Sequence, residues 1–168
     1  MTKERKLEIL KQALLLEKRG KAFYQKVAEH TDHHAVKSLF SQMAEEEDKH
    51  IQALLSQYKA IKELGLFNAT DSSFFENPTQ TADEILTDDI VKRIANSDYE
   101  SAAISAAISM EEKAVEVYAN RAKQTTDSEE KKLYTWLAEW EKQHLDQLLK
   151  IDQITTEKIW MDNSFWPF

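Results

Sequence analysis

Two segments of the chain carry the same set of potential metal ligands. In each segment a glutamate is followed three residues later by a histidine, and a further glutamate lies thirty residues before the pair. The six residues are Glu17, Glu47, His50, Glu111, Glu141 and His144. On a helix, a spacing of three residues places two side chains on one face. Carboxylates with one imidazole per metal suit iron or manganese, and zinc could occupy the same ligands without redox activity.

These ligands belong to an internal repeat with an offset of 94 residues. Residues 13–55 align with residues 107–149 without a gap, and 13 of the 43 pairs are identical. In an antiparallel helical hairpin, two residues lie at one level when they are equidistant from the turn. The midpoints of 17 and 47 and of 111 and 141 fall at 32 and 126, among residues that favour turns. The two glutamates of each hairpin should therefore face each other.

Four glutamates and two histidines would then meet in the middle of apolar helix faces. Four unpaired buried carboxylates would be very costly, and they would protonate rather than stay charged. Two divalent cations would balance their charge. The alternative is a coincidence in which the glutamates reach solvent. We therefore predict a dinuclear metal site, whose ligands would suit iron or manganese and could also hold zinc.

Composition and periodicity predict the elements that position these ligands. The 168 residues include only two glycines and two prolines, too few for the turns of a sheet-containing fold, so the predicted class is all-α. Apolar periodicity predicts helices over about 3–29, 34–63, 97–122 and 127–154. These form hairpin repeats at 3–63 and 97–154 within a single domain over 1–168. Residues 66–96 are expected to form a crossover and 155–168 an aromatic tail.

Smaller signals refine these elements. Ser97 and Glu100 have the spacing of a capping box. Residues 81–84 and 87–90 are candidate starts of short helices in the crossover. The apolar tail, which includes Phe165, Trp166 and Phe168, is expected to pack on the bundle or on a second chain, most simply in a homodimer.

Charge and cysteine content exclude several classes of function. The net charge of −8 argues against a surface that binds nucleic acid or an anionic membrane. The chain has no cysteine, which excludes disulfides, thiolate zinc sites, iron–sulfur clusters and thiol catalysis. The charged N-terminus has no apolar run of signal-peptide type, and no stretch approaches the length of a membrane span. We expect a cytoplasmic protein.

Four segments together resemble a known family. They are residues 17–24 (EKRGKAFY), 40–50 (FSQMAEEEDKH), 111–118 (EEKAVEVY) and 137–144 (LAEWEKQH). The set resembles the rubrerythrin branch of the ferritin-like di-iron carboxylate proteins, over about residues 5–155. The resemblance implies a ferritin-like four-helix bundle with a long crossover between the second and third helices. It also implies that Glu47 and Glu141 bridge two irons, that Glu17 and His50 are terminal on one iron, and that Glu111 and His144 are terminal on the other.

The resemblance implies a di-iron oxidoreductase that reacts with peroxide or dioxygen. A ferroxidase linked to iron storage, with Fe(II) as its substrate, and a non-enzymatic metal-binding protein are the alternatives. Full-length rubrerythrins also carry a cysteine-ligated rubredoxin domain, which this chain lacks, so its electron donor should be another protein. They have a second glutamate on the third helix where this chain has Ala114.

Several residues near the predicted ligands have two interpretations each. Tyr24 and Tyr118 lie two turns after Glu17 and Glu111. They could have a functional role, as hydrogen-bond donors to ligand carboxylates or as redox-active tyrosines, or they could be ordinary core tyrosines. Gly20 and its equivalent Ala114 could leave room for an oxidant or allow close helix approach.

Other polar clusters are expected to be solvent-exposed. The histidines at the first turn are more simply a solvated helix end than a metal site; they are His30, His33 and His34. The remaining helix glutamates are expected to lie on solvated faces; they are Glu45, Glu46, Glu112, Glu116 and Glu139.

Overall fold

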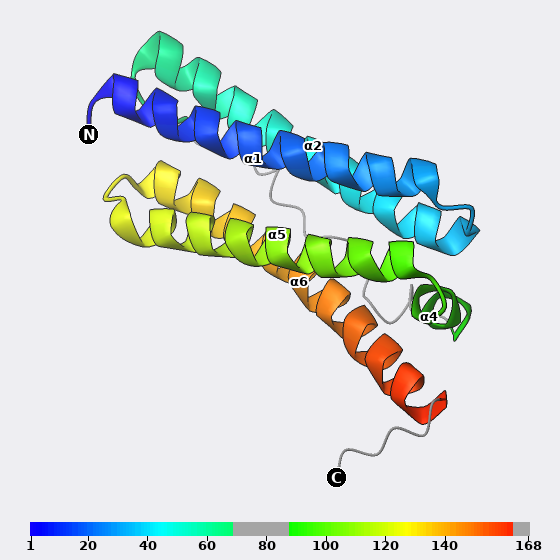
Figure 1. Cartoon of the computed structure of the whole chain (residues 1–168). Coiled ribbons are helices and arrows are strands. Elements are labelled where there is room, and N and C mark those ends of the chain that lie inside the picture. Colours follow the sequence, from blue (N-terminus) through cyan, green and yellow to red (C-terminus); the bar gives the residue numbers. More distant parts are fainter. Residues whose placement is uncertain (69–87, 163–168) are drawn as a thin grey trace.

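The computed structural model describes residues 1–68 and 88–162, which are helical apart from short connections (Figure 1). The helices are α1 (Lys3–His30), α2 (His34–Leu64), α4 (Asp88–Ala95), α5 (Asp98–Gln124) and α6 (Ser128–Asp162). The four long helices form the predicted all-α bundle. Within the described residues, no helix has both the length and the apolar character needed to cross a membrane.

Local sequence signals set several helix ends. Thr2 Oγ1 accepts a hydrogen bond from the backbone N–H of Arg5 at the start of α1. Gly65 ends α2 with a φ of 75°, a left-handed conformation that costs glycine little. Ser97 Oγ accepts from the N–H of Glu100 at the start of α5, as the capping box predicts. The Glu100 side chain, however, accepts hydrogen bonds from Thr31 and Arg93 instead of from the Ser97 backbone.

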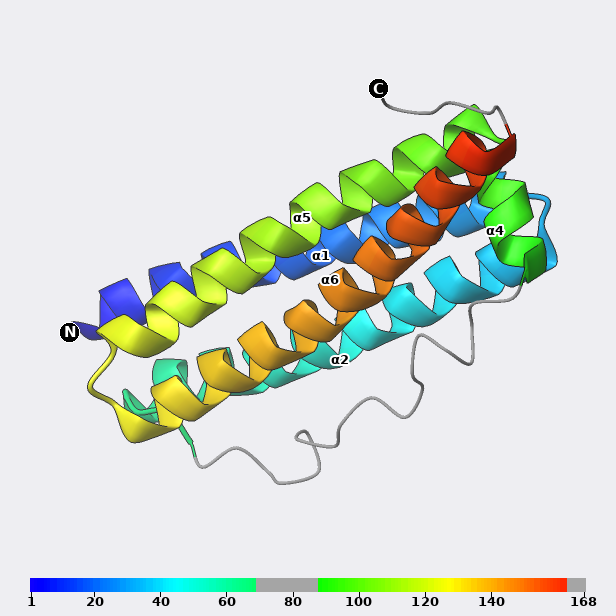
Figure 2. The same ribbon diagram turned by 90° about the horizontal axis from the view of Figure 1, so that it is seen from below.

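The long helices pack as two antiparallel hairpins, α1 with α2 and α5 with α6. The hairpins lie face to face, so that α1 faces α5 and α2 faces α6 (Figures 1 and 2). Because α2 ends at the opposite end of the bundle from the start of α5, these two helices run in the same direction. Their connection therefore begins and ends at opposite ends of the bundle, as expected of a crossover. Residues 69–87 of that connection are not described.

The end of the crossover is helical. The predicted start at residues 87–90 is followed by α4, which packs against α6 and α5 (Figure 1). Ile90 and Ile94 of α4 are 2% and 1% exposed, so this short helix covers one end of the core. The other candidate helix start, at residues 81–84, lies outside the described residues.

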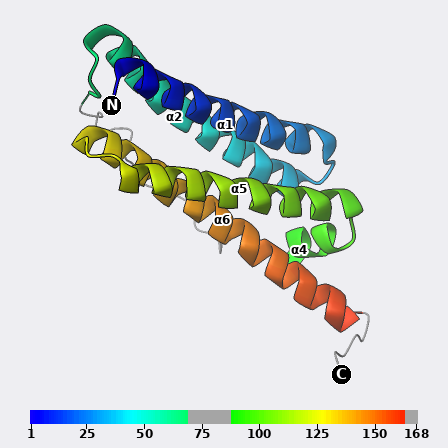
Figure 3. The same cartoon turned by 60° about the vertical axis from the view of Figure 1, so that its left-hand side comes forward.

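The last helix is longer than predicted. The sequence predicted an end near residue 154, but α6 continues to Asp162 and extends past the body of the bundle (Figure 3). No glycine or proline interrupts residues 155–162, so the chain has no local reason to leave the helix. Trp160 and Met161 are 53% and 83% exposed. The aromatic residues of the tail that we expected to be buried, Phe165, Trp166 and Phe168, lie outside the described residues.

Two apolar clusters flank the middle of the bundle. One includes Phe40, Met43 and Leu148, near the turn between α1 and α2. The other includes Leu54 and Leu133, near the turn between α5 and α6. The predicted ligands lie at the level between the two clusters, so the surrounding helices are fixed by apolar packing on both sides.

Candidate metal centre

The six predicted ligands are buried together, with contributions from all four long helices. They are Glu17 on α1, Glu47 and His50 on α2, Glu111 on α5, and Glu141 and His144 on α6, each no more than 3% exposed. They form two groups whose candidate ligand atoms lie within 4.8 Å of one another. The first group is Glu17, Glu47, His50 and Glu141, and the second is Glu47, Glu111, Glu141 and His144. Two carboxylates, Glu47 and Glu141, belong to both groups.

Each histidine turns its Nδ1 atom toward carboxylates. His50 Nδ1 lies 3.0 Å from Glu17 Oε2, 3.0 Å from Glu141 Oε1 and 3.5 Å from Glu47 Oε2. His144 Nδ1 lies 3.3 Å from Glu141 Oε2, 3.6 Å from Glu111 Oε1 and 3.9 Å from Glu47 Oε1. The two imidazoles therefore face the same carboxylate cluster from opposite hairpins.

The hydrogen bonding of these groups is incomplete in a way that fits a cation site. Both carboxylate oxygens of Glu141 and the Nδ1 atom of His144 are buried without a well-directed hydrogen bond. Buried polar atoms are rarely left unsatisfied unless an ion or water completes them. Carboxylate oxygens with one imidazole for each group are donors that suit iron or manganese. The residues present thus fit a pair of divalent metal ions.

Burial and mutual repulsion perturb the carboxylates. Burial, with added repulsion from Glu141 and Glu17, holds the pKa of Glu47 well above its ordinary value. Burial and the neighbouring Glu141 raise the pKa of Glu111 to about 7. Burial also acts to raise the pKa of Glu141, but attraction to His50 and to the nearby His144 outweighs it and holds that pKa well below the ordinary value. The cluster thus contains carboxylates that hold protons more strongly than usual beside one that stays ionised.

Two buried tyrosines connect the hairpins at this level. The Tyr24 hydroxyl, on the first hairpin, donates to Oε1 of Glu111 on the second. The Tyr118 hydroxyl, on the second hairpin, donates to Oε1 of Glu17 on the first. Burial, followed by the charge of the carboxylate it contacts, raises the pKa of each tyrosine well above its ordinary value, so both remain protonated donors. Of the two interpretations from sequence, the structure shows the carboxylate contact, made crosswise between the hairpins.

One glutamate that we expected on a solvated face is part of this centre. Glu46 is only 8% exposed, and its Oε2 lies 2.7 Å from Nε2 of His144. Its Oε1 accepts a hydrogen bond from Gln42, at 3.3 Å. The expectation was wrong because α2 contacts α6 as well as α1, so its buried face is wider than one apolar stripe. The other glutamates expected to be exposed are exposed: Glu45, Glu112, Glu116 and Glu139.

The outer side of His50 has different neighbours. Trp136 and Trp140 on α6 place their rings 5.4 and 5.3 Å from the His50 ring, nearly perpendicular to it. The Nε2 atom of His50 has no hydrogen-bond partner among the described residues. The sequence interpretation missed both tryptophans. The available signal was the repeat itself, which aligns Trp140 with Glu46 at the same offset as the ligands.

A small cavity adjoins the carboxylates. Its volume is about 20 Å³, and it is lined by Leu16, Glu17, Gly20, Glu47, Met110, Glu111, Ala114 and Glu141. A Cβ atom at Gly20 would lie 3.3 Å from the Cδ and Oε1 atoms of Glu47. Gly20 therefore allows the Glu47 carboxylate to approach the backbone of α1, and Gly20 and Ala114 border a small free space beside the cluster. Whether an oxidant uses this space stays a prediction.

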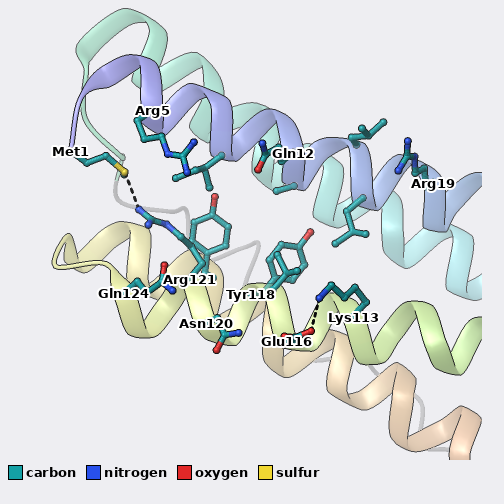
Figure 4. A pocket seen from close by; sticks show the side chains of 16 residues that line it. Met1, Arg5, Gln12, Arg19, Lys113, Glu116, Tyr118, Asn120, Arg121 and Gln124 are labelled. Carbon is teal, nitrogen blue, oxygen red and sulfur yellow. Dashed lines mark hydrogen bonds and ion pairs between the residues drawn. The ribbon is translucent and has the colours of Figure 1, made fainter.

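The larger hollow of this face is separate from the cluster. A groove of about 630 Å³ runs between α1 and α5 (Figure 4). Figure 4 shows Tyr118 between these helices, with Arg5, Gln12 and Arg19 from α1 and Lys113 from α5 along the groove. Leu16 lines both the groove and the small cavity. The groove and the small cavity are thus neighbours that share this one side chain.

The histidines at the first turn do not join a metal-capable group within residues 1–68 and 88–162. His30 and His34 are exposed, and His30 Nδ1 lies 2.8 Å from the carbonyl oxygen of Lys26 in the preceding turn. This arrangement matches the solvated helix end that the sequence favoured.

Comparison with known proteins supports the same class of site. The family model described as Rubrerythrin matches residues 8–152, which include all six predicted ligands. No curated protein and no solved structure matches the chain.

Proposed function

The chain belongs to the rubrerythrin family, and from that premise we propose that it is a non-haem di-iron protein that reacts with peroxide or dioxygen. The observation that carries the proposal is the pair of overlapping four-residue groups at the centre of the bundle. In the proposed ligand set, Glu47 and Glu141, which belong to both groups, would be shared by the two iron ions. Glu17 and His50 complete one position, and Glu111 and His144 complete the other.

The tyrosines would orient the terminal carboxylates. Because Tyr118 bonds to Oε1 of Glu17, that carboxylate turns its Oε2 atom toward His50. Tyr24 donates to Oε1 of Glu111 across the hairpins, and this same atom lies 3.6 Å from Nδ1 of His144. Both hydroxyls keep their protons at neutral pH, since their pKa values are raised. They would therefore hold the two carboxylates in place without becoming charged.

The small cavity is the proposed location for the oxidant. It lies against the carboxylates and is bordered by Gly20 and Ala114, the two smallest side chains at this level. Two bound Fe(II) ions would supply the two electrons that, with two protons, reduce one molecule of hydrogen peroxide to two of water. The apolar clusters on either side would exclude bulk water from the carboxylates.

The source of electrons for repeated cycles is proposed to be another protein. The chain has no cysteine, so it carries no iron–sulfur or rubredoxin centre of its own. A single oxidation should therefore consume the electrons held in the loaded protein, and sustained turnover should need an added reductant. We further propose that the chain acts as a homodimer.

The test is anaerobic loading with Fe(II), followed by rapid mixing with peroxide or with dioxygen. We expect two irons per chain and one stoichiometric oxidation event, with turnover only when a reductant is added. If the loaded protein resists both oxidants for minutes, the redox proposal fails and the site has a structural role. Oxidation of many more Fe(II) ions than two per chain, with mineral formed, would instead favour a ferroxidase that stores iron.

Matched variants connect the reaction to the cluster. Glu111→Gln should weaken iron binding, whereas Glu112→Gln, which changes the exposed neighbour on the same helix, should not. Ala114→Glu should fill the small cavity and slow the oxidation. Unchanged oxidation kinetics in Ala114→Glu would show that the oxidant does not use this space.

A further inference from the structure

The two histidines of the centre differ at the ring nitrogen that points away from the carboxylates. We propose that Glu46 is a positioning residue for His144, and that it makes the metal position served by His144 the tighter of two inequivalent positions. The position served by His50, which is enclosed by tryptophans, is then the weaker. This inference rests on the proposed metal centre but adds a difference between its halves that the six ligands alone do not contain.

The difference arises at equivalent places in the two hairpins. Glu46 lies four residues before His50 on α2, and Trp140 lies four residues before His144 on α6. Each of the two reaches across to the histidine of the other hairpin. Glu46 Oε2 is 2.7 Å from Nε2 of His144, and the Trp140 ring is 5.3 Å from the ring of His50. One histidine is thus bonded to a carboxylate where the other contacts an indole.

The next layer follows the same division. Gln42, four residues before Glu46, donates to Glu46 Oε1 at 3.3 Å. The residue equivalent to Gln42 is Trp136, whose ring lies 5.4 Å from that of Trp140 and 5.4 Å from that of His50. At two positions one helical turn apart, the residues are therefore polar behind His144 and aromatic behind His50.

The hydrogen bond determines which tautomer His144 adopts when its ring is neutral, as a metal ligand must be. With Nε2–H donating to Glu46, the lone pair of His144 is on Nδ1, the atom that faces Glu141 and Glu111. A carboxylate behind an imidazole also increases the ability of the ring to donate electrons to a metal. Loss of such a partner commonly lowers metal affinity by about 10- to 100-fold.

His50 lacks this support. Its Nε2 atom has no hydrogen-bond partner among the described residues, and its ring is held by shape between two indoles. Trp136 and Trp140 are 8% and 3% exposed, so they also separate this ring from solvent. The His50 position therefore has a buried imidazole in the right place but no charge behind it.

The first test is a titration of the metal-free, full-length protein with Co(II), followed by competition with a chelator. We expect two binding steps, of which the tighter is weakened about 10- to 100-fold by Glu46→Ala while the weaker is unchanged. Glu46→Gln keeps the size and an acceptor oxygen but removes the charge, and should cause a smaller loss. Glu45→Ala removes the same charge from the adjacent exposed residue and should change neither step.

The second test follows the ring protons directly. In the Co(II)-loaded protein, the Nε2–H protons of the two bound histidines should give two separately shifted NMR signals. Glu46→Ala should shift and broaden only the His144 signal, because that proton loses its acceptor and exchanges faster. Trp140→Phe should affect only the His50 signal. A mutation that acted through general loosening of the bundle would disturb both signals.

The outcomes separate this inference from the proposed function. If the unmodified protein binds two Co(II) ions and Glu46→Ala weakens both steps equally or neither step, the role of Glu46 is overturned while the metal centre stands. If the unmodified protein binds no Co(II), the metal centre fails and the inference fails with it.

Discussion

The two hairpins contribute matching residues to the centre of the bundle but different residues behind it. Each supplies two glutamates, one histidine and one tyrosine, and all eight side chains are almost fully buried. Behind the histidines, Glu46 and Gln42 on α2 correspond to Trp140 and Trp136 on α6. The comparison separates two requirements. The groups that would hold metal ions follow from ligand chemistry, whereas the layer behind them is free to make the two positions unequal.

A second comparison concerns buried carboxylates inside and outside the centre. Glu100 and Glu130, at the ends of the bundle, are 2% and 1% exposed. Each is paired with an arginine: Glu100 with Arg93 at 3.3 Å, and Glu130 with Arg121 at 2.5 Å. Within the described part of the chain, no arginine or lysine pairs with the four central glutamates. Elsewhere the chain pairs buried acids with arginine, whereas the central glutamates have only the imidazoles of His50 and His144 beside them. That difference is what the proposed metal ions would require.

The largest effect should come from replacing Glu47 and Glu141, the two carboxylates that belong to both groups of candidate ligands. In the double variant Glu47→Ala, Glu141→Ala, we expect most of both metal ions to be lost, because each half loses two of its four groups. Metal analysis after anaerobic loading and desalting measures this. The matched control changes the exposed equivalent pair, Glu45→Ala with Glu139→Ala, and should keep two ions. Two tightly bound ions in the Glu47, Glu141 variant would refute the shared site.

The next effect is on the pH dependence of stability without metal. The pKa of Glu111 rises to about 7 in the folded chain from an ordinary 4.5, so the folded state binds more protons between these values. The free energy of unfolding should therefore fall as the pH rises through this window. The raised pKa values of His50 and His144 act in the same direction above about pH 6.5, because their extra stability is lost on deprotonation.

Thermal unfolding of chelated and Fe(II)-loaded protein between about pH 5 and pH 8 measures this effect. Metal ligands must be deprotonated to bind, so stabilisation by the metal should increase with pH while the metal-free protein becomes less stable. The two midpoints should thus separate as the pH rises. Midpoints that stay parallel across the range would count against protonated carboxylates in the centre.

A smaller effect is expected from removing the tyrosine hydroxyls that connect the hairpins, and it tests whether the two contacts stabilise the fold equally. Tyr24→Phe and Tyr118→Phe each remove a hydroxyl that donates to a carboxylate of the other hairpin. Each should lower the free energy of unfolding by about 1–3 kcal/mol, and by similar amounts. Urea denaturation measures the change. A large difference between the two variants in the free energy of unfolding would show that the two hairpins also differ at the ligand carboxylates, and not only behind the histidines.

Tyr134→Phe is the control for these variants. The Tyr134 ring stacks on that of Tyr118, but its buried hydroxyl has no hydrogen-bond partner among the described residues. Its removal should therefore cost little or be stabilising.

The smallest effect should come from the equivalent small residues. Ala114→Gly should lower the free energy of unfolding by about 1 kcal/mol, the usual cost of glycine within a helix. Gly20→Ala should raise the free energy of unfolding by less than Ala114→Gly lowers it, because the added methyl group would lie 3.3 Å from the Glu47 side chain. Urea denaturation of both variants measures the two changes in the free energy of unfolding. A full gain in Gly20→Ala would show that Glu47 moves freely and that the close approach at Gly20 has no cost.

The sequence predicted the bundle and brought the six ligand positions together because both depend on periodicity. The starts of α1 and α5 are each within one residue of prediction, and they coincide with capping by Thr2 and Ser97. The predicted end of α6 was wrong because the chain has no glycine or proline near residue 154 to end the helix. Composition alone cannot say whether an exposed helical extension will continue.

Glu46 shows the limit of a one-stripe interpretation. It is adjacent to Glu47, so it lies about 100° away around the helix, on what looked like the solvated side. Only the placement of α6 against α2 buries that side, and this contact between hairpins is not encoded in the periodicity of one helix. The same contact places the tryptophans of α6 at His50, which is why both features were missed together.

The pairing of the helices also bears on how the chain folds. Most contacts join helices that are neighbours in sequence, α1 with α2 and α5 with α6, and such local contacts form early. The later step, in which the hairpins dock, brings four carboxylates to one level. That step should be the slow one, faster when the acids are protonated or when a divalent cation is present. Refolding rates should therefore be higher with a divalent cation than with a chelator. The repulsion among the carboxylates would slow the docking of the hairpins, and a bound cation would cancel that repulsion.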